Sequence, residues 1–539
     1  MRKVFKRAAA LGIGLSLFGG VVAYGAHPSG YWPYLTAFQQ AQQSGDANAM
    51  ISTGEALLNY YSGLPMDTDT AGVRYNVYYN TYSLYEGMGK MQKANEALQG
   101  VIDTGTYLNF TDAVIMAKER IRKIDPMAEV YTVTNAQAPY YGAKNEPTSG
   151  VLYGRCYNES YESDAKNSSI VSFYVELGSG HNSADDFAWK IDEFDDGSKA
   201  ILINLNFPSE GNTVSQVNSG SLDGAINETL SYMATLNGPA FLRIGGEMNV
   251  WTTKTTPAEF KTAYTRIANM ARNIAPNVAL VFSPSYASPW GEDMESFWPD
   301  SSLVDWVGVS LYLNKYQYAN SPSSAGDVND MYFGLNQYAD AVKNIEHVVD
   351  LAGKYNKPVM VTESGSGYAI PSGSENLSAF AANRITELYG TLNMVYPQVK
   401  AIVHFDKNLG GYTYTLNGNS TVKAAYDNAV ANNPTLVKTL NQTAPSFTKL
   451  NGASGLSGNI QLRAYCDVIN QSVNVTYTLD GVQIGASSAM PFAVTLNTSS
   501  ITAGEHTLQA VFKASNGYSV TKTYTLTKAA DGTVSFAQK

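Results

Sequence analysis

Two glutamates stand where buried, strand-like runs of the chain come to an end. Glu247 follows the run 240–246, and Glu363 follows the run 359–362. Glycine and serine neighbours leave room for a bulky ligand close to the backbone at these places. Two carboxyl groups at one site can divide the cleavage of a glycosidic bond: one protonates the departing oxygen while the other attacks or stabilises the oxocarbenium-like centre. Their separation decides the stereochemistry, with about 5–5.5 Å typical of retention and a wider gap typical of inversion.

Each glutamate taken alone has an equally good structural interpretation, as the partner of an arginine or lysine at a loop. The two together, each closing a strand, favour catalysis. Arg243 lies four residues before Glu247, on the same side of its strand, and would either orient a carboxylate or form an internal salt bridge. We expect the substrate to contact a set of polar and aromatic residues near the strand ends: Arg243, Asn249, Trp251, Trp290, Tyr312 and Phe405.

Eight short β-rich runs, separated by helical stretches, position these residues. They span 151–156, 170–177, 200–206, 240–246, 278–283, 304–312, 359–362 and 399–405. Most are continuous apolar stretches, as expected of strands buried on both faces of a parallel sheet. Thr256, Pro257 and Glu259 supply the N-cap, first-turn proline and capping-box residue of one intervening helix. Eight such units predict a (β/α)₈ barrel of the α/β class, a TIM barrel, over residues 140–435, with its active site where the carboxyl ends of the strands meet.

Regions of different character flank the barrel, so we predict a multidomain chain. Residues 27–130 carry apolar side chains at three- and four-residue spacing, which predicts an all-α region. Two helix–turn–helix stretches in it resemble tetratricopeptide repeats. This region would either dock a protein partner or cap the next domain.

The C-terminal residues 445–530 alternate as strands do, with turns at Asp480–Gly481 and Asn516–Gly517. This pattern predicts an antiparallel β-sandwich. The region resembles the immunoglobulin-like modules of bacterial secreted proteins, which serve as spacers, adhesive units or carbohydrate binders. Because we find no row of exposed aromatic residues in it, we favour the spacer.

Four segments resemble glycoside hydrolase family 26, in the order and spacing of that family. They are RIGGEMNVW at 243–251, SPS at 283–285, VDWVGV at 304–309 and KPVMVTESG at 357–365. The resemblance covers about residues 150–430 and implies the clan of retaining enzymes with the acid/base on strand four and the nucleophile on strand seven. It therefore implies that Glu247 is the acid/base, that Glu363 is the nucleophile, and that Tyr312 is the strand-six tyrosine near the nucleophile.

Two positions depart from the family at the sugar next to the cleaved bond. The family has histidine directly before the acid/base glutamate, where this chain has Gly246, and tryptophan on strand eight, where this chain has Phe405 beside His404. We therefore expect the retaining chemistry of the clan and leave two substrates open, β-mannan and a bacterial exopolysaccharide or envelope glycan. The departures support an alternative function, a non-catalytic carbohydrate-binding or scaffold protein on a glycosidase-like barrel. An adhesin built from the flanking modules is a third interpretation, which would make the barrel incidental.

The first residues have the pattern of a secretory signal peptide. A basic segment at 2–7 precedes an apolar run at 8–22 and small residues at 23–25. The apolar run is short for a membrane span and is broken by glycines. We expect residues 1–26 to be removed and the mature chain to have no transmembrane span. The prediction is a bacterial protein that is secreted or associated with the cell envelope.

Composition and charge argue against several other classes of function. A net charge of −10 provides no basic surface for nucleic acid and is easier to reconcile with a neutral partner such as a polysaccharide. We find no phosphate-binding glycine loop, serine-nucleophile motif or histidine cluster, so we expect neither a cofactor nor a catalytic metal. The two cysteines, Cys156 and Cys466, are too few for a disulfide framework, and we expect two free thiols or at most one bridge between domains.

Overall fold

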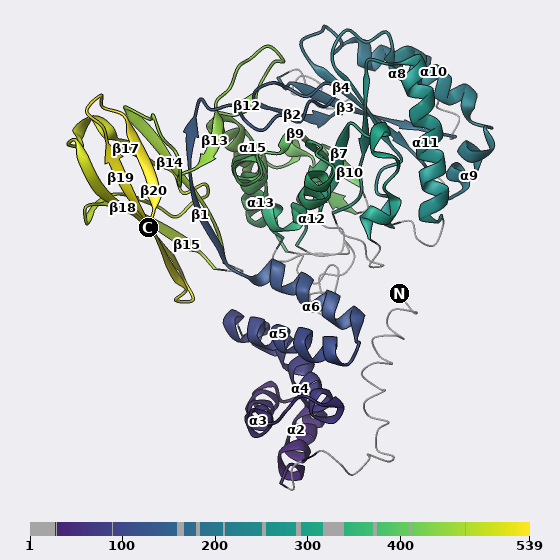
Figure 1. Ribbon diagram of the computed structural model, residues 1–539. Coiled ribbons are helices and arrows are strands. Elements are labelled where there is room, and N and C mark those ends of the chain that lie inside the picture. Colours follow the sequence, from purple (N-terminus) through teal and green to yellow (C-terminus); the bar gives the residue numbers. More distant parts are fainter. Residues whose placement is uncertain are drawn as a thin grey trace. The chain divides into compact units, whose positions relative to one another are not determined.

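The computed structural model describes most of the chain beyond its first residues (Figure 1). The described residues are 27, 30–88, 90–158, 167–178, 184–208, 211–250, 255–286, 293–315, 339–369, 375–409, 411–468 and 471–539. The chain divides into two compact units, Met1–Asp125 and Pro126–Lys539. The predicted signal peptide, 1–26, lies outside the described residues. No helix within the described ranges is long and apolar enough to cross a membrane.

The first unit is all-α, as predicted. Its helices are α2 (Trp32–Ser44), α3 (Ala47–Tyr61), α4 (Thr68–Gly87), α5 (Met91–Tyr107) and α6 (Thr111–Ile124), and each packs against the next. Asp46 caps α3 by accepting hydrogen bonds from the backbone N–H groups of Asn48 and Ala49, at 2.9 and 3.0 Å. A buried ion pair between Arg120 and Glu86, at 2.6 Å, joins α6 to α4. That these helices are tetratricopeptide repeats stays a prediction.

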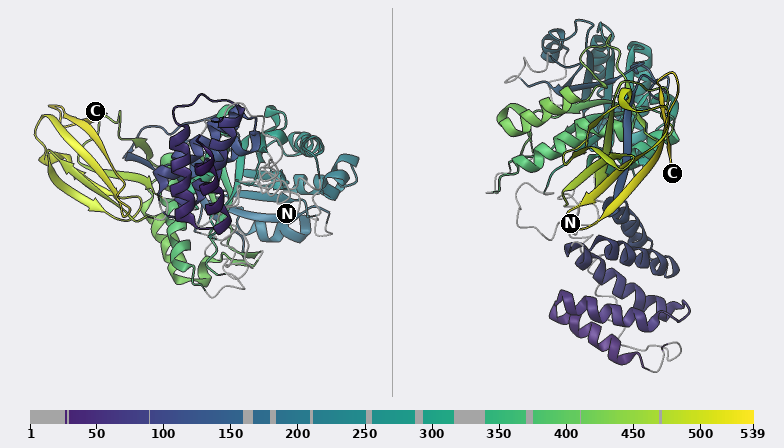
Figure 2. Two further views of the ribbon diagram at one scale, coloured as in Figure 1. Left: turned by 90° about the horizontal axis from the view of Figure 1, so that it is seen from below. Right: turned by 90° about the vertical axis from the view of Figure 1, so that its left-hand side faces the viewer.

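The second unit contains a closed ring of eight parallel strands with helices outside it (Figures 1 and 2). The strands are β2 (Val151–Cys156), β3 (Ile170–Glu176), β4 (Ala200–Asn206), β5 (Ala240–Ile244), β6 (Val278–Phe282), β7 (Trp306–Tyr312), β8 (Val359–Gly365) and β9 (Val399–His404). Strand β2 pairs with β9 as well as with β3, which closes the barrel. All eight predicted strands are confirmed, with small shifts at their ends.

The helices that follow the strands in the chain cover the outside of the ring. They are α8 (Ala184–Asp192), α9 (Gly211–Ser219), α10 (Asp223–Met233), α11 (Pro257–Ile274), α12 (Ala341–Lys354), α13 (Ser378–Gly390), α14 (Leu392–Val395) and α15 (Ser420–Asn432). Helix α11 begins with the predicted capping box: the hydroxyl of Thr256 accepts the N–H of Glu259 at 3.3 Å, and the carboxylate of Glu259 accepts the N–H of Thr256 at 2.8 Å.

Apolar side chains fill the inside of the ring. Buried residues from every strand form this core, among them Phe241 and Trp306, whose rings lie edge-on with centroids 5.3 Å apart. A barrel filled in this way is not a pore, so a ligand has access only at a rim, and in this fold that rim is formed by the carboxyl ends of the strands.

Two antiparallel sheets form the C-terminal part of the second unit, with strand orders β13–β1–β14–β17 and β16–β15–β18–β19–β20. Their strands are β1 (Met127–Thr134), β13 (Ser446–Lys449), β14 (Asn459–Asp467), β15 (Val473–Leu479), β16 (Val482–Ser487), β17 (Val494–Asn497), β18 (Gly504–Ala514), β19 (Ser519–Lys528) and β20 (Val534–Gln538). One buried core with side chains from both sheets joins them, which confirms the predicted β-sandwich. Strand β1 precedes the barrel in the chain, yet it pairs with β13 and β14 of this sandwich; it is the blue strand among the yellow-green ones of Figure 1. The sequence did not predict this pairing. An immunoglobulin-like identity stays a prediction.

A buried group of polar and charged side chains joins the barrel to the sandwich. The hydroxyl of Tyr465 on β14 donates to Asp340 Oδ2 at 2.8 Å, and Lys343 Nζ of α12 lies 3.5 Å from Asp467 Oδ2. Asp340 also caps α12 by accepting the N–H of Lys343 at 2.9 Å. Burial and the nearby carboxylate of Asp340 raise the pKa of Asp467 to about 6.

Candidate active site

Polar side chains from successive strands form a layer above the apolar core of the barrel. The buried members are Ser172 on β3, Asn204 on β4, Arg243 on β5, Ser283 after β6, Ser310 on β7 and Thr362 on β8. They form one hydrogen-bonded network: the amide of Asn204 donates to Ser172 Oγ at 2.6 Å, and the hydroxyls of Ser283 and Thr362 lie 2.9 Å apart. A buried network whose members are satisfied holds its side chains in one arrangement.

Arg243 is the centre of this network. Its side chain is 2% exposed, and every nitrogen of its guanidinium donates a hydrogen bond. Nε donates to Ser283 Oγ at 3.0 Å, and Nη2 donates to Ser310 Oγ at 2.7 Å. Nη1 donates to Asn204 Oδ1 at 3.3 Å and to Glu363 Oε1. Arg243 therefore fits both interpretations of its sequence position. It forms an internal salt bridge, and the carboxylate that it holds in this bridge is Glu363, one of the two candidate catalytic groups.

A left-handed turn after β5 delivers Glu247 to the site. The strand ends at Ile244, and then Gly245 and Glu247 have positive φ angles of 52° and 64°. This conformation is strained for a residue with a side chain, and such strain concentrates at functional sites. The N–H of Glu247 donates to the carbonyl oxygen of Ser283 at 2.8 Å, which holds the turn against the end of the next strand.

The surroundings of Glu247 favour its protonated form. Removal from water and the negative charge of Glu363 raise the pKa of Glu247, while Arg243 and the hydroxyl of Ser310 oppose the shift in part. A carboxyl group with a raised pKa keeps its proton at a pH where an ordinary carboxyl group is ionised. Glu247 is therefore suited to donate a proton.

Gly246 lies directly against Arg243, and this contact explains why position 246 has no side chain. A Cβ atom built there would lie well inside 3.0 Å of three atoms of the guanidinium, closer than real Cβ atoms approach. A side chain at position 246, such as the histidine of family 26, would therefore require the guanidinium of Arg243 to move from its place in the network.

An irregularity in the pairing of β8 turns Glu363 into the site. The register between β7 and β8 shifts by one residue at Thr362, so the neighbouring side chains of Thr362 and Glu363 both reach the interior network. Bulges re-aim side chains in this way. Glu363 accepts a hydrogen bond on each oxygen, from Arg243 Nη1 on Oε1 and from the hydroxyl of Tyr312 on Oε2 at 2.8 Å. Both donors stabilise a negative charge at this position.

Aromatic side chains form a wall beside Glu363. The ring of Phe405 lies edge-on to the rings of Tyr174, Tyr312 and Tyr414, with centroids 5.9 to 6.0 Å apart. Phe405 is 6% exposed and so forms the back of this wall. Sequence reasoning missed Tyr174 on β3, because a strand buried on both faces is apolar throughout and its pattern does not show which residues face inward.

The predicted site residues fall into three groups. The structure gathers five of them around the buried network: Arg243, Glu247, Tyr312, Glu363 and Phe405. Asn249 is 1% exposed, and its amide exchanges hydrogen bonds of 2.8 and 3.0 Å with the backbone of Ser285, so we assign it to holding the loop after β5 and not to the substrate. Trp251 and Trp290 lie outside the described residues.

The two neighbours of Phe405 face away from the site. The carboxylate of Asp406 pairs with Arg155 at 3.1 Å, and the ring of His404 lies against Tyr426 of α15, with centroids 6.0 Å apart. Burial lowers the pKa of His404 and favours its uncharged ring. Neither residue is positioned for catalysis.

Other kinds of reactive centre find no support among the described residues. They contain no group of three His, Cys, Asp or Glu side chains that could hold a metal ion. Cys156 and Cys466 are free and buried, and burial raises the pKa of each thiol to about 12. A thiol with so high a pKa is a poor nucleophile at neutral pH.

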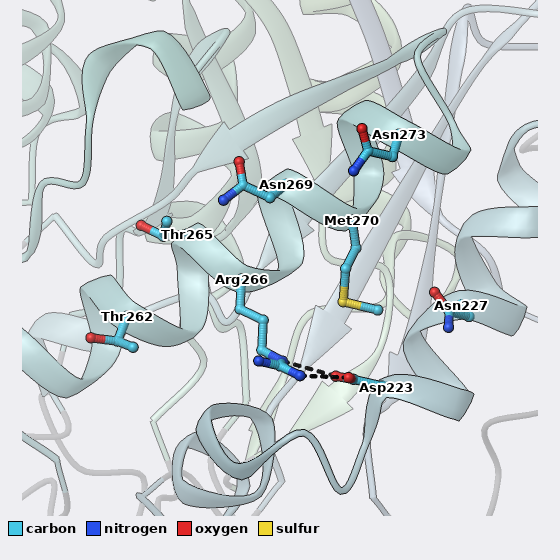
Figure 3. A pocket seen from close by; sticks show the side chains of 8 residues that line it. All are labelled: Asp223, Asn227, Thr262, Thr265, Arg266, Asn269, Met270 and Asn273. Carbon is cyan, nitrogen blue, oxygen red and sulfur yellow. Dashed lines mark hydrogen bonds and ion pairs between the residues drawn. The ribbon is translucent and has the colours of Figure 1, made fainter.

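A shallow hollow on the outside of the barrel is separate from this site. It has a volume of about 540 Å³, and α10 and α11 supply its lining residues: Asp223, Asn227, Thr262, Thr265, Arg266, Asn269, Met270 and Asn273 (Figure 3). Its two charged residues, Arg266 and Asp223, form an ion pair at 2.5 Å and so neutralise each other. The hollow therefore offers no acid or base for bond cleavage.

No known family model and no curated protein sequence matches the chain. Solved structures match its fold. A family 26 β-mannanase from Bacteroides ovatus matches with a TM-score of 0.37 at 15% identity, over 54% of this chain and 90% of that chain. Endoglucanase Cel5A of Thermotoga maritima matches at 0.34 and 13% identity, over 51% and 96%, and xylanase 10B of the same organism at 0.32 and 14%, over 52% and 96%. These similarities concern the fold, so the function has to be inferred from the residues of the site.

Proposed function

We propose that the protein is a retaining glycoside hydrolase that cleaves β-glycosidic bonds of a polysaccharide by double displacement. The observation that carries the proposal is the contrast between two carboxyl groups at strand ends of one barrel. Glu363 is paired with a guanidinium and accepts a tyrosine hydroxyl, while the surroundings of Glu247 raise its pKa. Carboxyl groups whose environments differ in this way divide the roles of nucleophile and acid.

In the first step, Glu247 donates its proton to the glycosidic oxygen and Glu363 attacks the anomeric carbon. The bond to the leaving sugar breaks, and a glycosyl ester forms on Glu363. Arg243 and Tyr312 hold the Glu363 carboxylate in position for the attack. Because Arg243 is itself fixed by its other hydrogen bonds, little reorganisation is needed at the moment of reaction.

Formation of the ester removes the negative charge of Glu363. That charge is one of the causes that raise the pKa of Glu247, so its loss lowers this pKa at the step in which Glu247 must accept a proton from water. The water then attacks the anomeric carbon, the ester bond breaks, and Glu363 leaves as a carboxylate. Two inversions at the same carbon give net retention.

The proposal leaves two substrate candidates, β-mannan and a bacterial exopolysaccharide or envelope glycan. The resemblance of residues 243–251 and 357–365 to family 26 supports β-mannan, whereas Gly246 and Phe405 depart from it at the sugar next to the cleaved bond. We place the enzyme outside the cytoplasm, secreted or associated with the cell envelope, on the signal-peptide pattern of residues 1–26. We also propose that the helical unit docks a protein partner.

A panel of mannans, glucans, xylans and exopolysaccharides, assayed with wild type and Glu363→Ala, tests the proposal. We expect the variant to lose more than roughly 10³-fold in kcat and to regain turnover with azide, which can replace the missing nucleophile. Product analysis by NMR should show a retained anomeric configuration. Asp427→Asn is the control, because this carboxylate is exposed and pairs with Lys423 on α15.

Equal activity of Glu363→Ala and wild type would refute the assignment of the nucleophile. An inverted product would refute double displacement. Binding to a glycan of the panel without any turnover would favour the alternative, a non-catalytic carbohydrate-binding protein on a glycosidase-like barrel.

A further inference from the structure

Two polar groups at the aromatic wall beside Glu363 have no hydrogen-bond or ion-pair partner within the part of the chain that the structure describes. The first is the hydroxyl of Tyr174 on β3, two residues beyond Ser172 and so on the same inward face of the strand. This oxygen is buried and has no hydrogen-bond partner among the described residues. Buried polar groups in native proteins are nearly always paired, so an unpaired one beside an active site points to a ligand that completes it.

The hydroxyl of Tyr174 lies within the electric field of Glu363. Burial and the charge of Glu363 raise the pKa of Tyr174 well above its usual range. The hydroxyl therefore keeps its proton and remains a hydrogen-bond donor. Glu363 also raises this pKa as a nearby acceptor, but no hydrogen bond of normal geometry joins it to the Tyr174 hydroxyl, so a bound molecule can compete for that proton.

The second group is the ammonium of Lys407, two residues beyond Phe405. It lies 5.3 Å from the centroid of the Tyr174 ring, and its side chain is half-buried. It forms no ion pair with any carboxylate among the described residues. The other two cations of this region are used within the protein, Arg243 by Glu363 and Arg155 by Asp406. Lys407 is thus a cation held over an aromatic ring, and no carboxylate of the described residues compensates its charge.

We propose that Tyr174 and Lys407 together bind a carboxylate carried by the sugar next to Glu363, so that the substrate is an acidic polysaccharide containing a hexuronic acid. This inference rests on the proposed glycosidase function and names its substrate class. A neutral sugar hydroxyl would satisfy Tyr174 and leave the ammonium uncompensated. A carboxylate can accept from the hydroxyl with one oxygen and pair with the ammonium through the other.

The charge of the whole chain limits what kind of polymer fits. At a net charge of −10, a polymer with a negative charge on every sugar would be repelled. We therefore assign the acidic sugar to a mixed polymer that contains neutral as well as acidic residues. Sulfate esters offer the same anionic oxygens, so the experiment has to separate the two.

Deacylated gellan, which has glucuronate in every repeat, is the first probe, and carboxyl-reduced gellan is its neutral counterpart. κ-Carrageenan supplies sulfate esters in place of carboxylates. We expect wild type to cleave gellan with a kcat/KM at least tenfold above that for the reduced polymer. Lys407→Met should abolish this preference by lowering kcat/KM for gellan alone, Lys407→Arg should keep most of it, and Tyr174→Phe should lower it by about tenfold.

Matched controls separate these effects from general damage. Lys354→Met removes another ammonium that lies over a tyrosine ring, 5.6 Å from the centroid of Tyr355 at the end of α12. Tyr264→Phe removes another buried hydroxyl without a hydrogen-bond partner, on α11. Both variants should keep the wild-type preference.

The outcomes distinguish this inference from the proposed function. Cleavage of neutral glycans with no preference for gellan, or an equal effect of Lys407→Met on both polymers, overturns the inference and leaves the glycosidase intact. A preference for κ-carrageenan replaces the carboxylate by a sulfate and overturns the assignment to a uronic acid. Calorimetric binding of Glu363→Ala to gellan but not to reduced gellan, with no cleavage by wild type, supports the carboxylate site and refutes the hydrolase. Failure of gellan to bind or to be cleaved overturns the inference.

Discussion

Replacing Gly246 by alanine adds one methyl group, yet we expect it to disable the site. The added Cβ would lie well inside 3.0 Å of the Arg243 guanidinium, whereas ordinary van der Waals contact begins at 3.4 Å, so the guanidinium has to move by on the order of 1 Å. The end of an arginine side chain usually moves aside at small cost. This one is 2% exposed and held on every nitrogen, including the bond to Glu363. Gly246 does not have a positive φ, so backbone strain makes no contribution.

The expected loss follows from the bond between Arg243 and Glu363. A hydrogen bond to a charged group contributes about 1.5–3 kcal/mol, and each 1.36 kcal/mol is a factor of ten in rate. We therefore expect kcat/KM for Gly246→Ala to fall roughly 10- to 150-fold. Overpacking of the buried layer should also lower the free energy of unfolding by about 1–3 kcal/mol.

Steady-state kinetics on the best glycan of the panel, with thermal unfolding of the same samples, measures both effects. Gly353→Ala is the control, because a Cβ at this position in α12 meets nothing within 4 Å. A double-mutant cycle isolates the cause: once Arg243→Ala has removed the guanidinium, the added methyl group should no longer destabilise the fold. The steric explanation would be refuted if Gly246→Ala lowered the free energy of unfolding equally in the presence of Arg243→Ala. Wild-type activity of Gly246→Ala would refute it as well.

Three further predictions concern the site and the contact between the modules. Tyr312→Phe removes the 2.8 Å hydrogen bond to Glu363 Oε2 and should lower kcat about 10- to 100-fold. Because it also leaves an oxygen of a buried carboxylate without that donor, the free energy of unfolding should fall by about 1–3 kcal/mol; wild-type kcat in this variant would refute the positioning role of Tyr312. If Glu247 is the acid, as proposed, its raised pKa means that activity should fall as the pH rises through this pKa. Glu363→Gln, which removes a raising charge, should move the titration of ¹³C-labelled Glu247 to lower pH, and an unmoved titration would contradict the coupling. Asp467 has its pKa raised to about 6, so the folded state binds this proton more tightly than the unfolded chain, and its contribution to stability is full below about pH 4 and is lost as the pH rises through 6. The melting temperature of wild type relative to Asp467→Asn should therefore rise between pH 7 and pH 4, by an amount equivalent to at most about 3 kcal/mol, and a constant difference would contradict the shift.

Several features of the barrel could be predicted because they depend on local patterns. A strand buried on both faces has to be apolar along its length, which made all eight strands visible in the sequence. The capping box at Thr256 and Glu259 was equally local, since its two hydrogen bonds join residues three apart. The pairing of β1 with β14 was not predictable in this way, because strands so far apart in the chain carry no mark of each other.

The residues of the site also divide into those that the sequence could predict and those that it could not. Glu247 and Glu363 could be found because each closes a strand, and the fold brings the carboxyl ends of strands to one rim. The role of Asn249 could not be found, because the sequence does not show that its amide is bonded to the backbone of Ser285. Tyr174 was missed for a related reason: which residues of a buried strand face inward depends on how the ring closes.

The sequence by itself determined the eight strands, their order, and the two glutamates that end the fourth and the seventh, because burial and strand position are encoded in short stretches of residues. Only the tertiary structure decided what surrounds those glutamates. Arg243 and Glu363 are 120 residues apart in the chain, and their pairing depends on barrel closure and on the register shift at Thr362. Those surroundings raise the pKa of Glu247 and hold Glu363 between a guanidinium and a tyrosine hydroxyl. Packing between distant strands thus gives the two carboxyl groups the different environments on which their proposed roles rest.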